Sequence, residues 1–279
     1  MWNLVILFHL KASDEKKISK IFATKADCVV LDIEDGVALN RKQQARENIR
    51  NLFTTNKEVQ NDIDSKYTVR INAPLTDLAK EDIKTLFTNL PKEAIPKCVF
   101  IPKTNTPDEI KWLYEQFNNS IKTHADPIDN LNLFFYMESA TSLINLKQII
   151  QTSIELTNTK YNKRFNLEGF VFGSDDFCAD IGATRTHDAS ELIYARQKMV
   201  TYCKAFRLKA IDMVYIDFKD LNGLKLQSEH GYRMGFTGKQ VIHPAQVDIV
   251  QEAFKPSQDK IKWATGLVVK SNIFFKYFF

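Results

Sequence analysis

The sequence is poor in cysteine, and its four cysteines form no CxxC pair. Cys28, Cys98, Cys178 and Cys203 each lie in an apolar or helical stretch, which is typical of reduced thiols in the core of an intracellular protein. The chain also has no cluster of cysteines and histidines that would suggest a zinc site. Disulfide scaffolds and zinc-binding domains are therefore poor descriptions of this sequence.

Long apolar runs and a strong charge of one sign are also missing. No run approaches the ~20 residues that a membrane-spanning helix needs. The 38 Lys and Arg against 34 Asp and Glu give a net charge of +4, too weak a bias to indicate nucleic-acid binding, although it suits an anionic small ligand. The apolar opening, Met1–Leu10, lacks the basic start and cleavage site of a signal peptide and the Arg and Ser content of a mitochondrial presequence, so a buried strand is expected there.

Eight short apolar runs recur along the chain and predict eight strands. Several are continuous rather than alternating, as expected for strands buried on both faces of a parallel sheet. The runs are Leu4–Leu10, Cys28–Ile33, Thr68–Ile71, Cys98–Ile101, Leu131–Met137, Gly169–Phe172, Ala210–Ile216 and Phe236–Ile242.

The stretches between these runs show helical spacing. One apolar stripe comprises Ile110, Leu113, Tyr114 and Phe117, and another comprises Leu192, Ala195, Met199, Tyr202 and Phe206. Alternating strands and helices indicate an α/β fold, and eight repeats in 279 residues favour a single TIM (β/α)8 barrel with parallel strands. No Pro/Gly/Ser-rich linker divides the chain, and the polar stretch 118–130 is predicted to be a loop.

Polar residues follow seven consecutive apolar runs. In such a barrel the active site is built at the carboxyl ends of the strands, so these side chains are expected to meet at one mouth, although each alone could be a cap or turn residue. They are Asp32, Glu34 and Asp35, then Arg70 and Asn72, then Lys103, Glu138, Asp175 and Asp176, Asp217 and His243.

Two carboxylates on neighbouring strands point to a cation. Glu138 and either Asp175 or Asp176 would lie close together, and like charges at short distance need a cation or a raised pKa. An oxygen-only donor set favours Mg²⁺. The alternative is that Glu138 forms an ion pair with Arg70 or Lys103.

Arg70 offers a planar fork that can bind a carboxylate at two points. A salt bridge from Arg70 to Glu34 or Asp35 is the competing interpretation, and it is compatible with the first because it would hold the guanidinium in place. Mg²⁺ with a carboxylate clamp predicts a 2-oxo or hydroxy acid substrate, whose carbonyl the metal would polarise.

Two lysines and one glycine-lysine pair are candidate contacts for the phosphates of a ligand. Lys16 and Lys20 are spaced i, i+4 at the start of a predicted helix that Ser13 or Asp14 can cap, so they would share a face. On spacing alone, a solvated helix face explains them better. Gly238-Lys239 lacks the other P-loop positions.

Several of these motifs together resemble the HpcH/HpaI aldolase and citrate lyase β-subunit family. The resemblance runs from about Ser13 to about Ala264. It is carried by Leu31–Val37 (LDIEDGV), Val69–Asn72 (VRIN), Ile101–Lys103 (IPK), Met137–Ala140 (MESA), Phe172–Phe177 (FGSDDF), Leu192–Lys198 (LIYARQK), Ala210–Phe218 (AIDMVYIDF) and Met234–Pro244 (MGFTGKQVIHP). The longer motifs are most similar to those of the family's animal mitochondrial members.

The resemblance implies a TIM barrel that binds Mg²⁺, assembles as a homotrimer and works in mitochondria; without that inference the location would be cytoplasmic. It implies retro-Claisen cleavage of (3S)-citramalyl-CoA to acetyl-CoA and pyruvate, with weak malate-synthase-like activity. Matched motif by motif, the implied metal ligands are Glu138 and Asp176, and Arg70 would bind the carboxylate of the 2-oxo acid. Lys16, Lys20, Ile242 and His243 would contact the acyl-CoA substrate.

The two ends of the chain depart from the family pattern. The family's first strand reads RSxLYVPG, whereas here Val5–Ala12 reads VILFHLKA, so its substrate-contacting Tyr is replaced by His9 and its Pro-Gly turn is missing. Residues 1–264 are expected to form the catalytic barrel, and residues 265–279 an atypical aromatic tail. Residues 266–279 contain no acidic residue, so the family's C-terminal catalytic aspartate has no counterpart and no catalytic acid or base is identified.

Two other functions remain open at this point. One is a metal-dependent aldolase or condensing enzyme that acts on a different 2-oxo acid. The other is a non-catalytic or truncated subunit that binds CoA esters, which the acid-free tail would favour.

Overall fold

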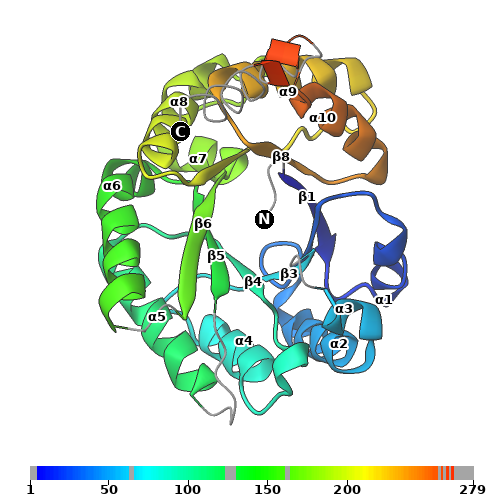
Figure 1. Cartoon of the computed structure of the whole chain (residues 1–279), viewed down its shortest axis with the longest axis vertical. Coiled ribbons are helices and arrows are strands. Elements are labelled where there is room, and N and C mark those ends of the chain that lie inside the picture. The colour runs from blue at the N-terminus through cyan, green and yellow to red at the C-terminus, as the bar shows by residue number, and fades with distance from the viewer. Residues whose placement is uncertain are drawn as a thin grey trace, which may run out of the picture.

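The eight strands of the described chain close into one parallel barrel. The computed structural model describes residues 5–62, 66–122, 130–160 and 164–256, with residues 259, 262, 263, 265 and 266. The strands follow one another around the barrel in chain order and each pairs in parallel with its neighbours, β8 closing on β1 (Figure 1). The predicted α/β TIM-type barrel is confirmed.

Each strand lies where an apolar run predicted one. The strands are β1 Val5–Lys11, β2 Cys28–Asp32, β3 Tyr67–Arg70, β4 Cys98–Ile101, β5 Leu131–Met137, β6 Phe165–Phe172, β7 Lys209–Asp212 and β8 Gly238–Val241. The largest difference is at β7, which ends at Asp212 although the apolar run continues to Ile216. Asp217 was therefore wrongly placed at a strand end: the strand stops five residues earlier, and Asp212 occupies its carboxyl end.

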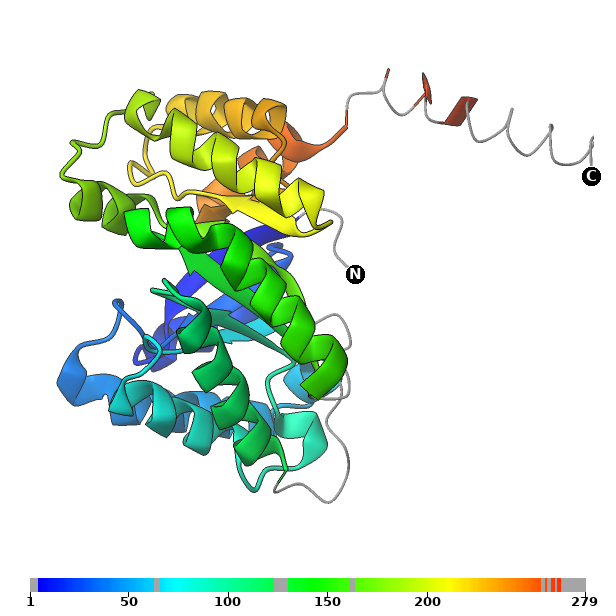
Figure 2. The same cartoon turned by 90° about the vertical axis from the view of Figure 1, so that its left-hand side faces the viewer.

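Helices form a ring outside the barrel (Figures 1 and 2). They are α1 Glu15–Ile18, α2 Lys42–Thr55, α3 Lys57–Gln60, α4 Asp77–Phe87, α5 Pro107–Ile121, α6 Ala140–Glu155, α7 Ser174–Ile181, α8 Ile193–Ala205, α9 Leu221–Met234 and α10 Val247–Phe254. None of the described helices is both long and apolar enough to cross a membrane.

Local sequence signals explain where several helices begin and end. Thr106 and Glu109 form a capping box at the start of α5. The predicted stripe of α5 is fully buried, and the helix continues to Ile121, so the predicted loop begins four residues too early. Residues 123–129 lie outside the described chain. Gly182, at φ +70°, ends α7 in the left-handed conformation that glycine adopts without a steric cost.

The predicted shared helical face of Lys16 and Lys20 is wrong. Asp14 caps α1 as expected, its carboxylate accepting from the Lys17 backbone N–H at 3.1 Å. However, α1 is only four residues long and ends at Ile18, so Lys20 lies beyond it. The i, i+4 spacing brings side chains together only within a continuous helix.

Two apolar layers form the core. The larger lies between the strands and the helix ring, and the smaller fills the barrel interior with Leu7, Cys28, Val30, Cys98, Phe100, Phe134, Tyr136, Val171 and Ile211. All four cysteines are buried and free, as predicted. The aromatic tail predicted for residues 265–279 lies outside the described residues apart from Thr265 and Gly266, so the proposed domain boundary stays a prediction.

Asp212 of β7, Lys239 of β8 and Arg196 of α8 form a cluster of charged side chains that is fully buried. Asp212 accepts two hydrogen bonds from Arg196, at 3.0 and 2.7 Å, and lies 3.7 Å from the Lys239 ammonium. Burial lowers the pKa of Lys239 to about 8, against the attraction of Asp212. Gly231 gives this carboxylate room, because a Cβ there would lie 2.4 Å from Asp212 Oδ2.

Asp212→Ala is expected to lower the free energy of unfolding by about 3–5 kcal/mol, because it leaves two buried cations without their anion. Urea denaturation of the variant measures this. Glu229→Ala is the control: its pairs with Lys225 and Arg233 span 4.0 and 3.9 Å at the surface, and its loss is expected to change stability by less than about 0.5 kcal/mol. Equal effects of the two substitutions would contradict a structural role for the buried cluster.

Candidate functional site

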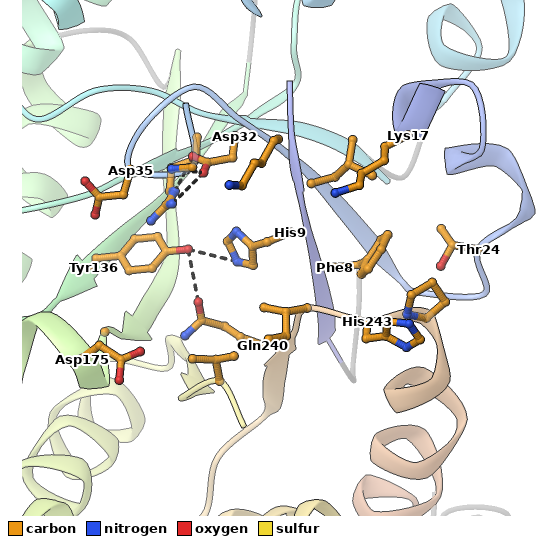
Figure 3. Close-up of a pocket in the computed structure, with 18 of the residues that line it drawn as sticks. Phe8, His9, Lys17, Thr24, Asp32, Asp35, Tyr136, Asp175, Gln240 and His243 are labelled. Atoms are coloured by element: carbon orange, nitrogen blue, oxygen red, sulfur yellow. Dashed lines mark hydrogen bonds and ion pairs between the residues drawn. The ribbon is translucent and has the colours of Figure 1, made fainter. Parts of the chain in front are cut away.

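A cavity of about 780 Å³ opens at the carboxyl ends of the strands (Figure 3). Its walls bring together most of the predicted strand-end residues: Asp32, Asp35, Arg70, Glu138, Asp175, Asp176 and His243. Asn72 was also a candidate, but it is buried among Lys42 and Asp82. Because several strands contribute to one concave surface, the mouth of this barrel has the form of an active site.

Arg70 is held along one edge by a neighbouring strand. Asp32 accepts from Arg70 Nε at 2.7 Å and from Nη2 at 2.8 Å, in a bidentate pair between residues that face each other in β2 and β3. Glu34 lies 3.1 Å from Nη1. Although burial opposes it, Arg70 lowers the pKa of Asp32 below its usual range. The guanidinium is thus held by two carboxylates, and because Asp32 takes one N–H each from Nε and Nη2, the other N–H groups of Nη1 and Nη2, beside Glu34, are those that remain for a ligand carboxylate.

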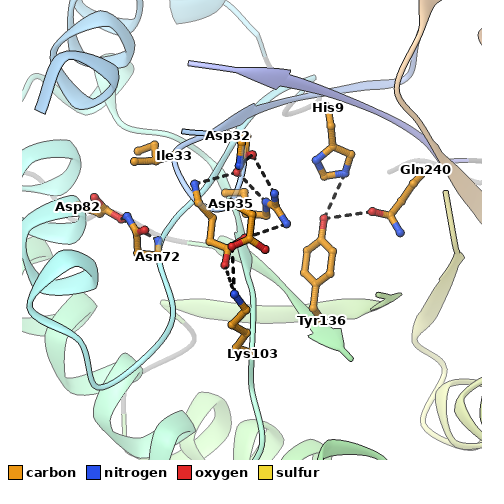
Figure 4. Close-up of polar contacts among 12 residues, drawn as sticks. His9, Asp32, Ile33, Asp35, Asn72, Asp82, Lys103, Tyr136 and Gln240 are labelled. Atoms are coloured by element: carbon orange, nitrogen blue, oxygen red, sulfur yellow. Dashed lines mark hydrogen bonds and ion pairs between the residues drawn. The ribbon is translucent and has the colours of Figure 1, made fainter. Parts of the chain in front are cut away.

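Lys103 does not form the predicted alternative pair with Glu138. Its ammonium binds Glu34 at 2.8 Å and Asp35 at 3.1 Å (Figure 4). Although burial opposes it, these two carboxylates raise the pKa of Lys103. Only the backbone N–H of Lys103 contacts Glu138, donating to Oε1 at 2.5 Å.

Glu138 is a buried carboxylate without an ion pair among the described residues. Its side chain is only 5 % exposed, and both candidate cations, Arg70 and Lys103, are bound to other carboxylates. Burial raises the pKa of Glu138 to about 8, against its hydrogen bond from Lys103, and the negative charge of Asp176 adds to the shift. The group therefore lacks the positive charge that would stabilise its ionised form.

The neighbouring aspartates have different surroundings. Asp175 forms an ion pair with Arg185, whereas the side chain of Asp176 has no ion pair or hydrogen bond in the described part of the chain and lines the same cavity as Glu138. Gly173 allows the close approach of β6 to Glu138, because a Cβ there would lie 2.4 Å from Glu138 Oε2. Two carboxylates without a counter-ion, one deeply buried, are a donor set that fits Mg²⁺ completed by water and ligand oxygens. The described residues hold no group of three or more potential metal ligands.

Three polar side chains form the floor of the cavity beside Arg70. Tyr136 Oη lies 3.2 Å from His9 Nε2 and 3.4 Å from Gln240 Oε1 (Figure 4). Arg70 lies over the Tyr136 ring, 5.5 Å from its centroid. Burial lowers the pKa of His9 to about 3, and the positive charge of Arg70 adds to the shift, so the imidazole is neutral.

Basic residues line the outer part of the cavity. Lys11, Lys17 and Lys20 all contribute, whereas Lys16 is exposed and is not among the lining residues. Lys17 also lies 3.6 Å from Asp14. Lys20, expected to contact the acyl-CoA, thus lies at the cavity wall, whereas Lys16 does not, and both roles stay predictions.

Ile242 and His243 form part of the rim. Their backbone N–H groups both donate to Gln246 Oε1, at 2.9 and 3.2 Å, so only their side chains and carbonyls remain for a ligand. The His243 imidazole accepts from Ala245 N through Nδ1 and stacks on Phe218 with 4.9 Å between ring centroids. This places a fixed aromatic surface at the entrance of the cavity.

Comparison with known proteins identifies the fold and its family. The HpcH/HpaI aldolase/citrate lyase family matches residues 5–244. The chain belongs to this family. Among curated relatives, the mitochondrial citramalyl-CoA lyases of Homo sapiens and Mus musculus are 42 % and 41 % identical, each over 94 % of this chain and 74 % of the relative. A (3S)-malyl-CoA thioesterase of Cereibacter sphaeroides is 28 % identical over 92 % of this chain and 79 % of the relative.

Two solved structures share the barrel. RipC from Yersinia pestis superimposes with a TM-score of 0.69 at 26 % identity, covering 92 % of this chain and 98 % of RipC. CitE from Mycobacterium tuberculosis, solved in complex with magnesium, acetoacetate and coenzyme A, gives a TM-score of 0.70 at 24 % identity. It covers 96 % of this chain and 87 % of CitE, and at that identity the likeness shows the fold.

The strand-end pattern does not identify Tyr136 and Gln240, which form part of the floor of the cavity. Tyr136 and Gln240 lie within strands, one residue before the strand end. The two-residue period of a strand was the available signal: Phe134, Tyr136 and Glu138 alternate on one face. The residue two positions before a polar strand-end residue faces the same way, so Glu138 indicates Tyr136 as a further residue of the cavity.

Glu138→Gln is expected to stabilise the metal-free protein at high pH. Because the pKa of Glu138 is about 8 in the folded state against an ordinary 4.5, the folded state holds its proton more tightly, and stability falls as pH rises between these values. The glutamine removes this loss, giving a gain on the order of 2–4 kcal/mol at pH 8.5 in EDTA and none near pH 4.5.

Urea denaturation at both pH values measures the difference. Glu93→Gln, at an exposed glutamate, is the matched control and is expected to change neither value. A stability gain for Glu138→Gln that is the same at both pH values would contradict the electrostatic explanation.

Proposed function

We propose that this protein is a Mg²⁺-dependent carbon–carbon lyase that cleaves citramalyl-CoA to acetyl-CoA and pyruvate. The observation that carries the proposal is the joint placement, in one cavity, of a rigid guanidinium and two carboxylates without counter-ions. The 42 % identity to the human citramalyl-CoA lyase, over 94 % of this chain, supports the choice of substrate. The mitochondrial location and the homotrimer implied by the resemblance remain predictions for this chain.

Each part of the cavity has one task in this proposal. Arg70 binds the carboxylate of the oxo or hydroxy acid half through the N–H groups of Nη1 and Nη2 that Asp32 does not take. Glu138 and Asp176 hold Mg²⁺, and Lys20, Ile242 and His243 contact the acyl-CoA half at the cavity entrance. The oxo acid half, which leaves as pyruvate, is thus held deep in the barrel by its carboxylate, and the thioester chain leads outwards.

When bound, Mg²⁺ supplies Lewis-acid stabilisation of the oxygen that carries negative charge during cleavage. The residues of this chain keep the two halves of the substrate aligned, and the apolar barrel interior below them excludes water from the floor of the cavity. Breaking the carbon–carbon bond turns the hydroxyl-bearing carbon into the keto carbon of pyruvate, so the hydroxyl loses its proton to a base, and the electron pair of the broken bond passes to the acetyl-CoA carbon, which takes a proton from a donor. None of the side chains assigned above is proposed as that proton donor.

Replacing the proposed metal ligand Asp176 is expected to abolish turnover, whereas the same replacement of the neighbouring Asp175 is not. Asp176→Asn should reduce Mg²⁺-dependent formation of acetyl-CoA and pyruvate from citramalyl-CoA by more than about 100-fold, beyond what loss of an indirect metal contact costs. Asp175→Asn is the matched control, because that carboxylate is bound to Arg185. It should retain activity within about tenfold.

The same assay distinguishes the other functions. Release of free CoA without acetyl-CoA would indicate thioester hydrolysis, and turnover only with another 2-oxo acid would indicate a different aldolase or condensing reaction. Tight binding of CoA esters without any turnover in the purified full chain would indicate a non-catalytic subunit. Equal activity of the Asp175 and Asp176 variants would overturn the metal assignment.

Lys20→Ala is expected to raise the KM for citramalyl-CoA about three- to tenfold with little change in kcat, because a partly solvated charge contact contributes roughly 1 kcal/mol to binding. Lys25→Ala is the matched control, since Lys25 is exposed and lies 3.6 Å from Asp248. Steady-state kinetics at two ionic strengths measures both. A larger effect of Lys25 than of Lys20 would contradict the assigned orientation of the CoA half.

A further inference from the structure

The side-chain amide of Gln240 has only one orientation that satisfies its surroundings. Its Nε2 donates to the backbone carbonyl of Phe172 at 3.0 Å and to that of Asp212 at 3.4 Å. Carbonyl oxygens accept and cannot donate, so the nitrogen must face them. Gln240 Oε1 therefore faces Tyr136 and can only accept.

This orientation determines where the proton of Tyr136 lies. Gln240 is 6 % exposed, and an unsatisfied acceptor at that depth would be costly. If the Tyr136 hydroxyl donated to His9, Oε1 would lose the donor that the geometry provides. Tyr136 therefore donates to Gln240, and its oxygen accepts from His9 Nε2. His9 is then the Nε2–H tautomer, with an unprotonated Nδ1.

His9 Nδ1 is a hydrogen-bond acceptor that has no hydrogen bond within the described part of the chain. His9 lines the cavity, and Figures 3 and 4 show its second ring nitrogen on the side that faces Asp32, which holds Arg70. Burial lowers the pKa of His9, and the nearby guanidinium adds to the shift against the opposing charge of Asp32, so a second proton on the ring is disfavoured. The neutral ring therefore has a lone pair on the nitrogen that faces Asp32 and the Arg70 guanidinium bound to it.

We infer that His9 Nδ1 accepts a hydrogen bond from the hydroxyl group next to the carboxylate of the bound acid, so that the site prefers a 2-hydroxy acid to a 2-oxo acid. The inference rests on the proposed function and specifies which half of the substrate is recognised. His9 is a specificity-determining contact, and Tyr136 and Gln240 are positioning residues that fix its tautomer.

The chemistry of the two ligand classes explains the preference. With the carboxylate on Arg70, the inference places the oxygen on the adjacent carbon, one bond further along the ligand, on the His9 side. A hydroxyl there has a proton to donate, whereas a keto oxygen would place its lone pairs against that of Nδ1. Cleavage converts the first into the second, so this contact is made by the substrate and lost in the product.

Two substitutions of His9 separate its two nitrogens. Asn places its amide near the position of Nδ1, whereas Gln extends to the position of Nε2 and retains the contact with Tyr136. The probes are L-lactate and pyruvate in the presence of Mg²⁺, which differ only at the carbon in question. Isothermal titration calorimetry gives the ratio of their Kd values for each protein.

The native protein and His9→Asn are expected to favour lactate over pyruvate. In His9→Gln the ratio should fall about three- to tenfold, the loss of one hydrogen bond. A ratio that is unchanged in His9→Gln, with both probes still bound, would overturn the inference while leaving the proposed function intact. If neither probe binds the native protein, and citramalyl-CoA is not cleaved, the proposed function fails instead.

The tautomer has a readout that does not depend on activity. Nitrogen-15 NMR of histidine-labelled protein, with the His9 signals assigned by their loss in His9→Gln, should show a protonated Nε2 and an unprotonated Nδ1. Tyr136→Phe should remove this preference and lower the lactate to pyruvate ratio, although residue 9 is unchanged. A protonated Nδ1 in the native protein would overturn the inference.

Discussion

The bidentate pair between Asp32 and Arg70 organises the mouth of this barrel. The two residues face each other in neighbouring strands, so the register of β2 and β3 sets the direction of the guanidinium. The fixed positive charge lies over the Tyr136 ring, and it adds to the burial that keeps His9 neutral. One ion pair thus fixes the position of the cationic group at the mouth and contributes to the neutral state of the histidine beside it. A loosely held arginine would provide the charge without either constraint.

The other charged groups near the mouth leave two carboxylates unneutralised. Lys103 is bound to Glu34 and Asp35, and Arg185 to Asp175. Glu138 and Asp176 remain, and the cost is visible in the raised pKa of Glu138. A fold selected for stability alone would pair or remove such a group, so this arrangement is most simply explained by a cation that arrives with the ligand.

Much of the fold could be predicted because each strand of a parallel barrel is a short apolar run. The strand ends also placed Arg70, Glu138 and the pair Asp175 and Asp176 at one mouth, since parallel strands bring their carboxyl ends together. Errors arose where local pattern and tertiary packing differ. The apolar run after Asp212 continues beyond the last β7 pairing, and α1 ends before Lys20. The strand ends left the choice between Asp175 and Asp176 open, because the ion pair of Asp175 with Arg185 is a contact that sequence spacing does not reveal.

The floor of the cavity shows why single positions are poor guides to a site. A histidine at residue 9 beside a buried guanidinium is acceptable only as a neutral ring, and a neutral ring needs its N–H satisfied. Tyr136 accepts that N–H, and Gln240 in turn accepts the tyrosine proton, so three strands that are distant in sequence share one hydrogen-bond requirement. A histidine at residue 9 of the first strand therefore makes physical sense only together with Tyr136 and Gln240. The unit that the fold specifies is the hydrogen-bonded set, and its chemistry follows from the direction of the bonds within it.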